Sequence, residues 1–157
     1  MLVYTLDGIG FFGPIIVFLL NIYLLRLRYP YLLAYLVFFF MNKYVNKILK
    51  LVIKQARPDG GISFINESYT GADKYGMPSG HAQSIMFSTF FLYFVTGSNL
   101  FLMIELFIGT LTLYQRWKYR RHTVEQLCVG SIFGILISYF SFYVTKKYLS
   151  NADINEI

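Results

Sequence analysis

Long apolar stretches separated by short polar segments account for most of this 157-residue chain. Because an α-helix needs about 20 mostly apolar residues to cross a bilayer, each of these stretches is long enough, or nearly so, to span one. Polar residues do not recur at every second position, which favours helices over strands. The pattern predicts an all-α, polytopic membrane helix bundle with about five transmembrane helices, near residues 9–26, 30–54, 79–97, 99–116 and 122–146.

The same pattern predicts one domain. We expect residues 1–150 to form it and residues 151–157 to be a short polar tail, with one sizeable loop at about 59–77. The approach to the first helix carries Asp7 but no Lys or Arg, and no small-residue cleavage site follows. We therefore expect this helix to be a permanent anchor and not a signal peptide.

Composition supports a membrane protein. Hydrophobic residues make up 56% of the chain and charged residues only 14%, which leaves too little polar surface to cover a soluble globule. The single cysteine, Cys128, excludes an internal disulfide and a cysteine-based metal site. The net charge of +6 needs a local explanation, because the basic residues gather at the ends of apolar stretches. We expect membrane lipids and a lipid substrate as partners, and no nucleic acid.

The first basic cluster ends the second apolar stretch. Its five cations follow one another at intervals of four, three, four and three residues, so they share one helical face: Lys43, Lys47, Lys50, Lys54 and Arg57. Basic side chains that reach the headgroups would explain several of them equally well. Pro58 ends the helix and places Arg57 at the mouth of the loop, where its guanidinium can bind phosphate oxygens.

The second cluster, Pro78-Ser79-Gly80-His81, precedes the next apolar stretch. Ser79 suits the N-cap of a helix, whose first backbone N–H groups attract anions. Gly80 lets an anion approach the backbone closely. A capped helix start alone would account for the first three residues, but His81 adds an imidazole that can transfer a proton near neutral pH.

The third cluster runs from Arg116 to His122. Lys118, Arg120 and Arg121 fit the ordinary pattern of cations at a membrane interface. His122 opens the last helix, and Glu125 and Gln126 follow it by three and four residues, so either side chain can reach its ring. An oxygen that accepts the Nδ1 proton would leave Nε2 as a nucleophile.

Five spans place all three clusters on the same side of the membrane. An ionisable side chain at a membrane is costly and is usually placed for function, so their convergence predicts one site for a polyanion, most naturally a phosphate.

The spacing of these clusters resembles the three-part motif of the type 2 phosphatidic acid phosphatase family. The motif consists of Lys50 with six residues before Arg57-Pro58, then Pro78-Ser79-Gly80-His81, then Arg116 with five residues before His122. The resemblance covers about residues 50–130. Two positions depart from it, since Gln126 stands where the family normally has Asp and Gln115 where it often has Ser. The dolichyl diphosphatase branch is more similar, sharing the run from Tyr75 to Ser79 and His122-Thr123 followed by Gln126.

The resemblance implies hydrolysis of a polyprenyl diphosphate, most naturally dolichyl diphosphate, to the monophosphate without metal or other cofactor. His122 would form a phosphohistidine, His81 would protonate the leaving group, and Gln126 or Glu125 would orient His122. Lys50, Arg57, Ser79, Gly80 and Arg116 would bind the phosphate. Undecaprenyl diphosphate or phosphatidic acid is the alternative substrate, and an inactive phospholipid-binding relative is the alternative of another class.

Location is predicted from positive charge. Arg26, Arg28, Lys146 and Lys147 lie on the side opposite the site, and positive residues favour the cytoplasm. We expect a site that faces the lumen of the endoplasmic reticulum, or the exterior of the plasma membrane in a bacterium. The sequon Asn66-Glu67-Ser68 in the long loop would then be open to glycosylation.

Overall fold

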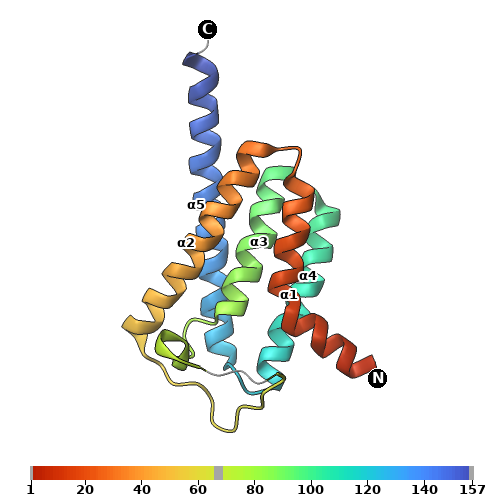
Figure 1. The fold of residues 1–157 in the computed structure, drawn as a ribbon, viewed down its shortest axis with the longest axis vertical. Coiled ribbons are helices and arrows are strands. Elements are labelled where there is room, and N and C mark those ends of the chain that lie inside the picture. The colour runs from red at the N-terminus through yellow and green to blue at the C-terminus, as the bar shows by residue number, and fades with distance from the viewer. Residues whose placement is uncertain (1, 66–68, 156–157) are drawn as a thin grey trace.

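The computed structural model describes residues 2–65 and 69–155, so the sequon at 66–68 lies outside the described residues. The described part contains five α-helices and no strand: α1 (Leu2–Leu25), α2 (Tyr29–Ile53), α3 (Gly80–Thr96), α4 (Asn99–Lys118) and α5 (Val124–Asn155). One short 3₁₀ helix, η1 (Gly71–Lys74), lies in the loop between α2 and α3. The predicted all-α bundle is confirmed (Figure 1).

Helix α3 is the centre of the bundle, because it packs against each of the other four α-helices. Aromatic rings form much of its contact with α2, where Phe91 lies 5.5 Å and Phe87 6.0 Å from Tyr35, centroid to centroid. On the other side, a Cβ at Gly130 of α5 would come within 2.6 Å of the Ser79 carbonyl oxygen. The small residue therefore lets α5 lie directly against the start of α3.

Two segments are long and apolar enough to cross a membrane by length and composition, Tyr4–Leu25 and Val124–Ser150. The remaining helices contain more polar residues but also expose large apolar side chains, such as Val37 and Phe40 on α2 and Phe107 on α4. An apolar surface of this extent on a helix bundle is typical of contact with lipid. The chain is therefore a membrane protein, and many of its polar residues are buried inside the bundle.

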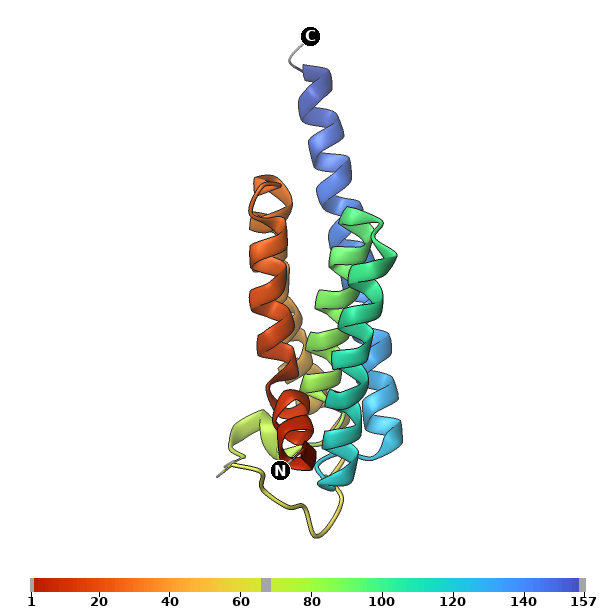
Figure 2. The same ribbon diagram turned by 90° about the vertical axis from the view of Figure 1, so that its right-hand side faces the viewer.

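One end of the bundle collects the segments that carry the predicted chemistry. The beginnings of α1, α3 and α5 meet the ends of α2 and α4 there, together with the α2–α3 loop (Figures 1 and 2). Helix α1 contains Pro14 and bends near it, as expected where a proline interrupts the helical hydrogen bonds. At the other end, α5 continues to Asn155 and extends beyond the other helices (Figure 2).

Candidate active site

Lys50 marks the point where α2 approaches the loop. Helix α2 ends three residues later, at Ile53, and its C-cap Lys54 adopts a left-handed conformation with φ 54°. The Lys50 side chain is buried, and its Nζ lies 2.8 Å from Oδ1 of Asp73 in η1. A buried ammonium needs a partner of opposite charge, and this partner comes from the loop.

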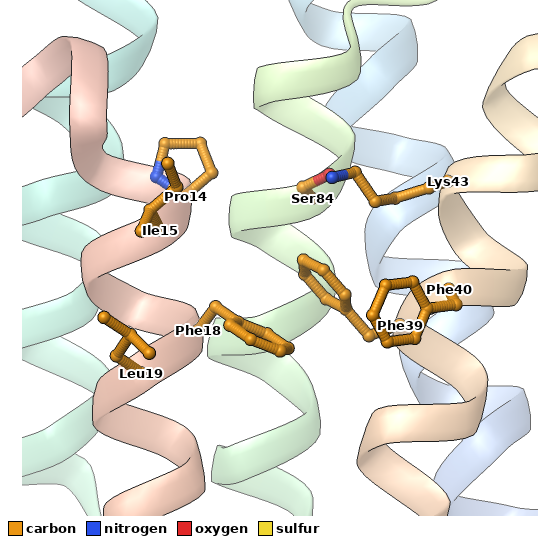
Figure 3. A pocket seen from close by; sticks show the side chains of 8 residues that line it. All are labelled: Pro14, Ile15, Phe18, Leu19, Phe39, Phe40, Lys43 and Ser84. Atoms are coloured by element: carbon orange, nitrogen blue, oxygen red, sulfur yellow. The ribbon is translucent and has the colours of Figure 1, made fainter.

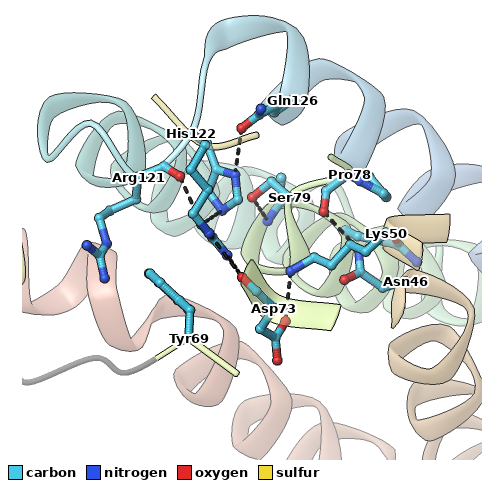
Figure 4. A network of polar contacts seen from close by, with 12 residues as sticks. Asn46, Lys50, Tyr69, Asp73, Pro78, Ser79, Arg121, His122 and Gln126 are labelled. Carbon is cyan, nitrogen blue, oxygen red and sulfur yellow. Dashed lines mark hydrogen bonds and ion pairs between the residues drawn. The ribbon is translucent and has the colours of Figure 1, made fainter. Parts of the chain in front are cut away.

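Arg57 connects three parts of the site. Its Nε and Nη2 donate to the carbonyl oxygen of Asp73, at 3.1 and 2.8 Å. Its Nη1 donates to the carbonyl oxygen of Arg121 at 2.9 Å and lies 3.1 Å from Nε2 of His122. The predicted first and third clusters therefore meet at this guanidinium. Figure 4 labels its partners Asp73, Arg121 and His122.

Tyr69 contacts three guanidinium groups of the site. Its ring lies beneath both Arg57 and Arg121, at 3.9 and 4.4 Å from the centroid, and its hydroxyl lies 3.4 Å from Nη2 of Arg116. Stacking on an aromatic face stabilises cations that would otherwise repel one another. The site thereby concentrates positive charge against a single ring.

The second cluster opens α3 as expected. Ser79 is the N-cap, and its Oγ accepts a hydrogen bond from the Ala82 N–H at 3.4 Å. A Cβ at Gly80 would lie 3.2 Å from Oδ1 of Asn46, so the α2 side chain comes close to the backbone there. Asn46 also donates to the Pro78 carbonyl oxygen at 3.2 Å and to Gln83 Oε1 at 2.8 Å. These bonds hold the start of α3 against α2.

The hydrogen bonds of His122 define its tautomer. An arginine can only donate, so Nε2 is the acceptor toward Arg57 and Nδ1 carries the proton. That proton points to Oε1 of Gln126 at 3.1 Å. The amide of Gln126 is oriented by its Nε2, which donates to Gln55 Oε1 at 2.9 Å and to the Ala56 carbonyl oxygen at 2.8 Å.

The charge of the site acts on both imidazoles. Burial, followed by the positive charges of Arg57 and Arg116, holds the pKa of His122 well below its ordinary value. Lys50 also interacts electrostatically with His122, and all three cations, Lys50, Arg57 and Arg116, interact with His81. The ring of His81 lies beside that of Phe11, with centroids 6.0 Å apart. At neutral pH, His122 is therefore an uncharged imidazole with its Nε2 lone pair in the polar site.

The structure brings together all eight residues that the sequence singles out for the site: Lys50, Arg57, Ser79, Gly80, His81, Arg116, His122 and Gln126. Glu125 is exposed and its Oε2 lies 3.4 Å from Nε2 of Gln55, so Gln126 and not Glu125 contacts His122.

Sequence reasoning missed Asp73, Tyr69 and Asn46. It also grouped Arg121 with the interfacial cations, whereas the structure buries Arg121 over Tyr69. Asn46 could have been recognised, because it precedes Lys50 by four residues on the same helical face. No comparable pattern marks the two loop residues.

An apolar groove opens beside the site between α1 and α2 (Figure 3). Its volume is about 320 Å³, and it is lined by Pro14, Ile15, Phe18, Leu19, Phe39, Phe40, Lys43 and Ser84. Ser84 follows His81 by one helical turn, and Lys43 precedes Asn46 by one turn. The groove therefore begins about one turn away from the polar site. Within the described residues, no three His, Cys, Asp or Glu side chains lie close enough together to hold a metal ion.

Residues 31–149 match the PAP2 superfamily over a region that includes every one of these site residues. The chain belongs to the PAP2 superfamily. The resemblance inferred from the spacing of the three clusters is confirmed.

This PAP2 chain is similar in sequence to three dolichyldiphosphatases. It is 33% identical over 117 residues to the dolichyldiphosphatase of Saccharomyces cerevisiae, covering 66% of this chain and 47% of that protein. It is 33% identical over 126 residues to dolichyldiphosphatase 1 of Mus musculus and of Rhinolophus ferrumequinum, covering 70% of this chain and 51% of theirs. The chain thus spans about half the length of the curated relatives it matches.

The fold has a counterpart among solved structures. A transmembrane PAP2-type phosphatidylglycerolphosphate phosphatase from Bacillus subtilis superposes with a TM-score of 0.67, over 94% of this chain and 76% of the other. The two sequences are 21% identical, so the comparison speaks to the arrangement of the helices.

Proposed function

We propose that this PAP2 protein is a membrane lipid phosphatase that hydrolyses a polyprenyl diphosphate of the dolichyl type to the monophosphate and phosphate. The observation that carries the proposal is the Nε2 of His122, which is unprotonated and lies 3.1 Å from Arg57 in a site built from cations. The named relatives add support, because those three are dolichyldiphosphatases.

In the proposed reaction, Nε2 of His122 attacks the terminal phosphorus and the bond from that phosphorus to the bridging oxygen breaks. The products of this step are a phosphohistidine and the lipid monophosphate. Oε1 of Gln126 accepts a hydrogen bond from the Nδ1–H of His122 and so supports the imidazolium that develops. His81 enters this step as an imidazolium and gives its proton to the departing oxygen; as the neutral imidazole it then takes a proton from the water that hydrolyses the phosphohistidine.

The charge of the phosphoryl group is held by fixed donors. Lys50, Arg57 and Arg116 bind its oxygens, and the backbone N–H groups at the start of α3, next to Ser79 and Gly80, complete the set. Groups that are oriented before the reaction stabilise a transition state without reorganisation, and the loss of one typically costs about 10² to 10³ in rate. The residues of the chain supply this chemistry without requiring a cofactor.

The apolar groove fits the other end of the substrate. An isoprenoid chain needs an apolar surface that is continuous with the bilayer, and the groove between α1 and α2 provides one within about a turn of the site (Figure 3). Lys43 at its edge can interact with a phosphate at the chain's head. The groove therefore favours a lipid diphosphate over a soluble phosphate ester.

The decisive experiment is phosphate release by the purified protein from a panel of dolichyl diphosphate, undecaprenyl diphosphate, phosphatidylglycerolphosphate and phosphatidic acid. We expect dolichyl diphosphate to have the highest kcat/KM, with no requirement for added metal. His122→Ala should abolish release, and acid quenching of the wild type should trap an acid-labile phosphoprotein that this variant lacks. Full activity of His122→Ala would refute the mechanism, and a preference for another lipid would reassign the substrate. Turnover of none of them would favour an inactive lipid-binding protein.

A lumen-facing site in the endoplasmic reticulum, or an exterior-facing one in a bacterial plasma membrane, is part of the proposal. Arg26 and Arg28 lie between α1 and α2 at the end of the bundle opposite the site, and Lys146 and Lys147 lie in the last turns of α5. Short cytoplasmic loops carry an excess of Lys and Arg, which supports this orientation.

A further inference from the structure

Two of the five cations of the first cluster, Lys50 and Arg57, are bound by one loop residue, Asp73. The carboxylate of Asp73 pairs with Nζ of Lys50 at 2.8 Å, while the carbonyl oxygen of Asp73 accepts two hydrogen bonds from Arg57 (Figure 4). A carboxylate and a phosphate present similar oxygens to such donors. Asp73 therefore satisfies the same groups that a bound phosphate would need.

The two partners differ in their access to solvent. The side chain of Lys50 is 3% exposed and that of Asp73 is 49% exposed. Lys50 thus depends on an anion inside the site, whereas Asp73 can be hydrated if the contact opens. Burial opposes ionisation of Asp73, but the hydrogen bond and charge of Lys50, together with the charges of Lys47 and Arg57, outweigh it and hold the pKa of Asp73 below its ordinary value. Asp73 is consequently an anion throughout the neutral range.

The contact also involves the nucleophile. Arg57, anchored by the Asp73 carbonyl oxygen, points Nη1 at Nε2 of His122 at 3.1 Å. This N–H occupies the lone pair with which His122 must attack phosphorus. For the attack to occur, Arg57 has to transfer this donor to the phosphoryl oxygens.

We propose that Asp73 is an internal competitor for phosphate: the incoming phosphate replaces it on Lys50 and Arg57, and η1 moves away as this exchange releases His122. The inference rests on the proposed phosphatase function only for its catalytic consequence, because the competition itself concerns phosphate binding. Asp73 would thereby lower the affinity of the site for phosphate.

The test is equilibrium binding of inorganic phosphate to the full chain in detergent, measured by dialysis with radiolabelled phosphate. Asp73→Asn removes the charge and keeps the shape, so we expect its Kd for phosphate to fall about fivefold, the scale of a partly exposed ion pair. Asp73→Glu should retain most of the competition. The matched control is Glu125→Gln, which removes the same charge from an exposed position near the site and should change the Kd less than twofold.

The same variants separate this inference from the proposed function. If Asp73→Asn binds phosphate more tightly than the wild type, but the wild type hydrolyses no lipid of the panel, the competition is supported and the phosphatase function is refuted. Hydrolysis of dolichyl diphosphate together with unchanged or weaker phosphate binding by Asp73→Asn would overturn the competition and leave the function standing. If the protein is active, Asp73→Asn should lower the KM for dolichyl diphosphate as well as the Kd for phosphate.

A second substitution guards against a folding defect. Asp73→Ser should show the same tighter binding if Asp73→Asn is poorly folded by gel filtration and thermal melting. Failure of both variants to fold would also overturn the inference, because a contact that the substrate displaces cannot be essential to the fold.

Discussion

Gln126 illustrates how single contacts explain the departures from the family pattern. Its Oε1 accepts the Nδ1 proton of His122 and also lies 3.3 Å from the Thr123 N–H, while Thr123 Oγ1 accepts the Gln126 N–H at 3.2 Å. This reciprocal pair is a capping box at the start of α5. Its Nε2 makes two further bonds to the α2–α3 loop, which a carboxylate could not donate. Glutamine therefore suits this position as an orienting residue.

Gln126→Ala should lower kcat for lipid hydrolysis by about 10²-fold, because His122 loses the acceptor that fixes its tautomer and supports its imidazolium. Glu125→Ala should change kcat less than about threefold, since its exposed carboxylate lies away from the ring. Steady-state kinetics of both variants checks this expectation. Equal, mild effects would assign the orienting role elsewhere.

The low pKa of His122 predicts the behaviour of the site in acid. The neutral imidazole should persist well below pH 6.5, the ordinary value. In the unfolded chain His122 takes up a proton near that value, so its contribution to the free energy of unfolding is present above it and is lost as pH falls below it. A ¹⁵N-histidine NMR titration of His81→Asn, which leaves one imidazole, should show an Nδ1-protonated tautomer at neutral pH. A midpoint at or above 6.5 would contradict the assignment.

At the scale of helices, the position of the site depends on the close approach of α5 to α3. Gly130 lies against the backbone of Ser79, whose N–H donates to the Gln126 carbonyl oxygen at 3.0 Å. The N-cap of α3 and the first turn of α5 are thereby joined. A wider spacing between α3 and α5 would change the geometry between His122 and the start of α3, where we propose that phosphate binds.

Gly130→Ala should reduce both stability and activity. The added methyl group would lie 2.6 Å from the Ser79 carbonyl oxygen, and relieving this contact requires one helix to shift, at a cost of about 1–3 kcal/mol. Thermal melting and kcat report the two effects. Gly8→Ala is the matched control, because a Cβ there meets nothing within 4 Å. Equal behaviour of the two variants would refute the packing argument.

Glu105 of α4 is a buried acidic residue that we expect to lower the stability of the helix bundle. It is fully buried beside Thr89 of α3 and Asn21 of α1, and neither of its side-chain oxygens forms a well-aligned hydrogen bond with another described residue. Burying a carboxyl group without a well-placed hydrogen-bond partner is unfavourable, and more so when it is ionised, whereas an amide of the same shape carries no charge and can both donate and accept. Glu105→Gln should therefore melt at the same or a higher temperature than the wild type. A fall of more than about 5 °C would indicate that the carboxyl group makes an essential contact.

At the scale of the whole molecule, the candidate site lies at one end of the bundle of five described α-helices, so it faces one side of the membrane. The α2–α3 loop lies at the same end of the bundle as the beginnings of α3 and α5, and the α1–α2 turn lies at the opposite end (Figure 2). In the proposed reaction, a lipid that enters from the bilayer through the groove between α1 and α2 would meet the proposed catalytic residues at this end of the bundle.

Labelling of introduced cysteines can test this orientation. In a Cys128→Ser background, Ser63→Cys on the loop and Leu27→Cys at the turn place a thiol at exposed positions near opposite ends. In sealed, cytoplasmic-side-out vesicles, a membrane-impermeant maleimide should label Leu27→Cys but label Ser63→Cys only after detergent is added. The reverse pattern would place the site in the cytoplasm, and equal labelling of both would contradict a membrane-spanning bundle.

The sequence by itself determined the helices and the chemistry at their ends. Apolar runs, Pro58 and the capping residue Ser79 act locally, so they predicted the five helices and the three clusters that supply cations and imidazoles. Only the tertiary structure decided which of these groups touch. The choice of Gln126 over Glu125, the stacking of Arg121 on Tyr69 and the pairing of Lys50 with Asp73 depend on segments far apart in the chain. Such contacts leave no periodic pattern in a loop, because they arise only when packing of the helices brings the loop back over the site.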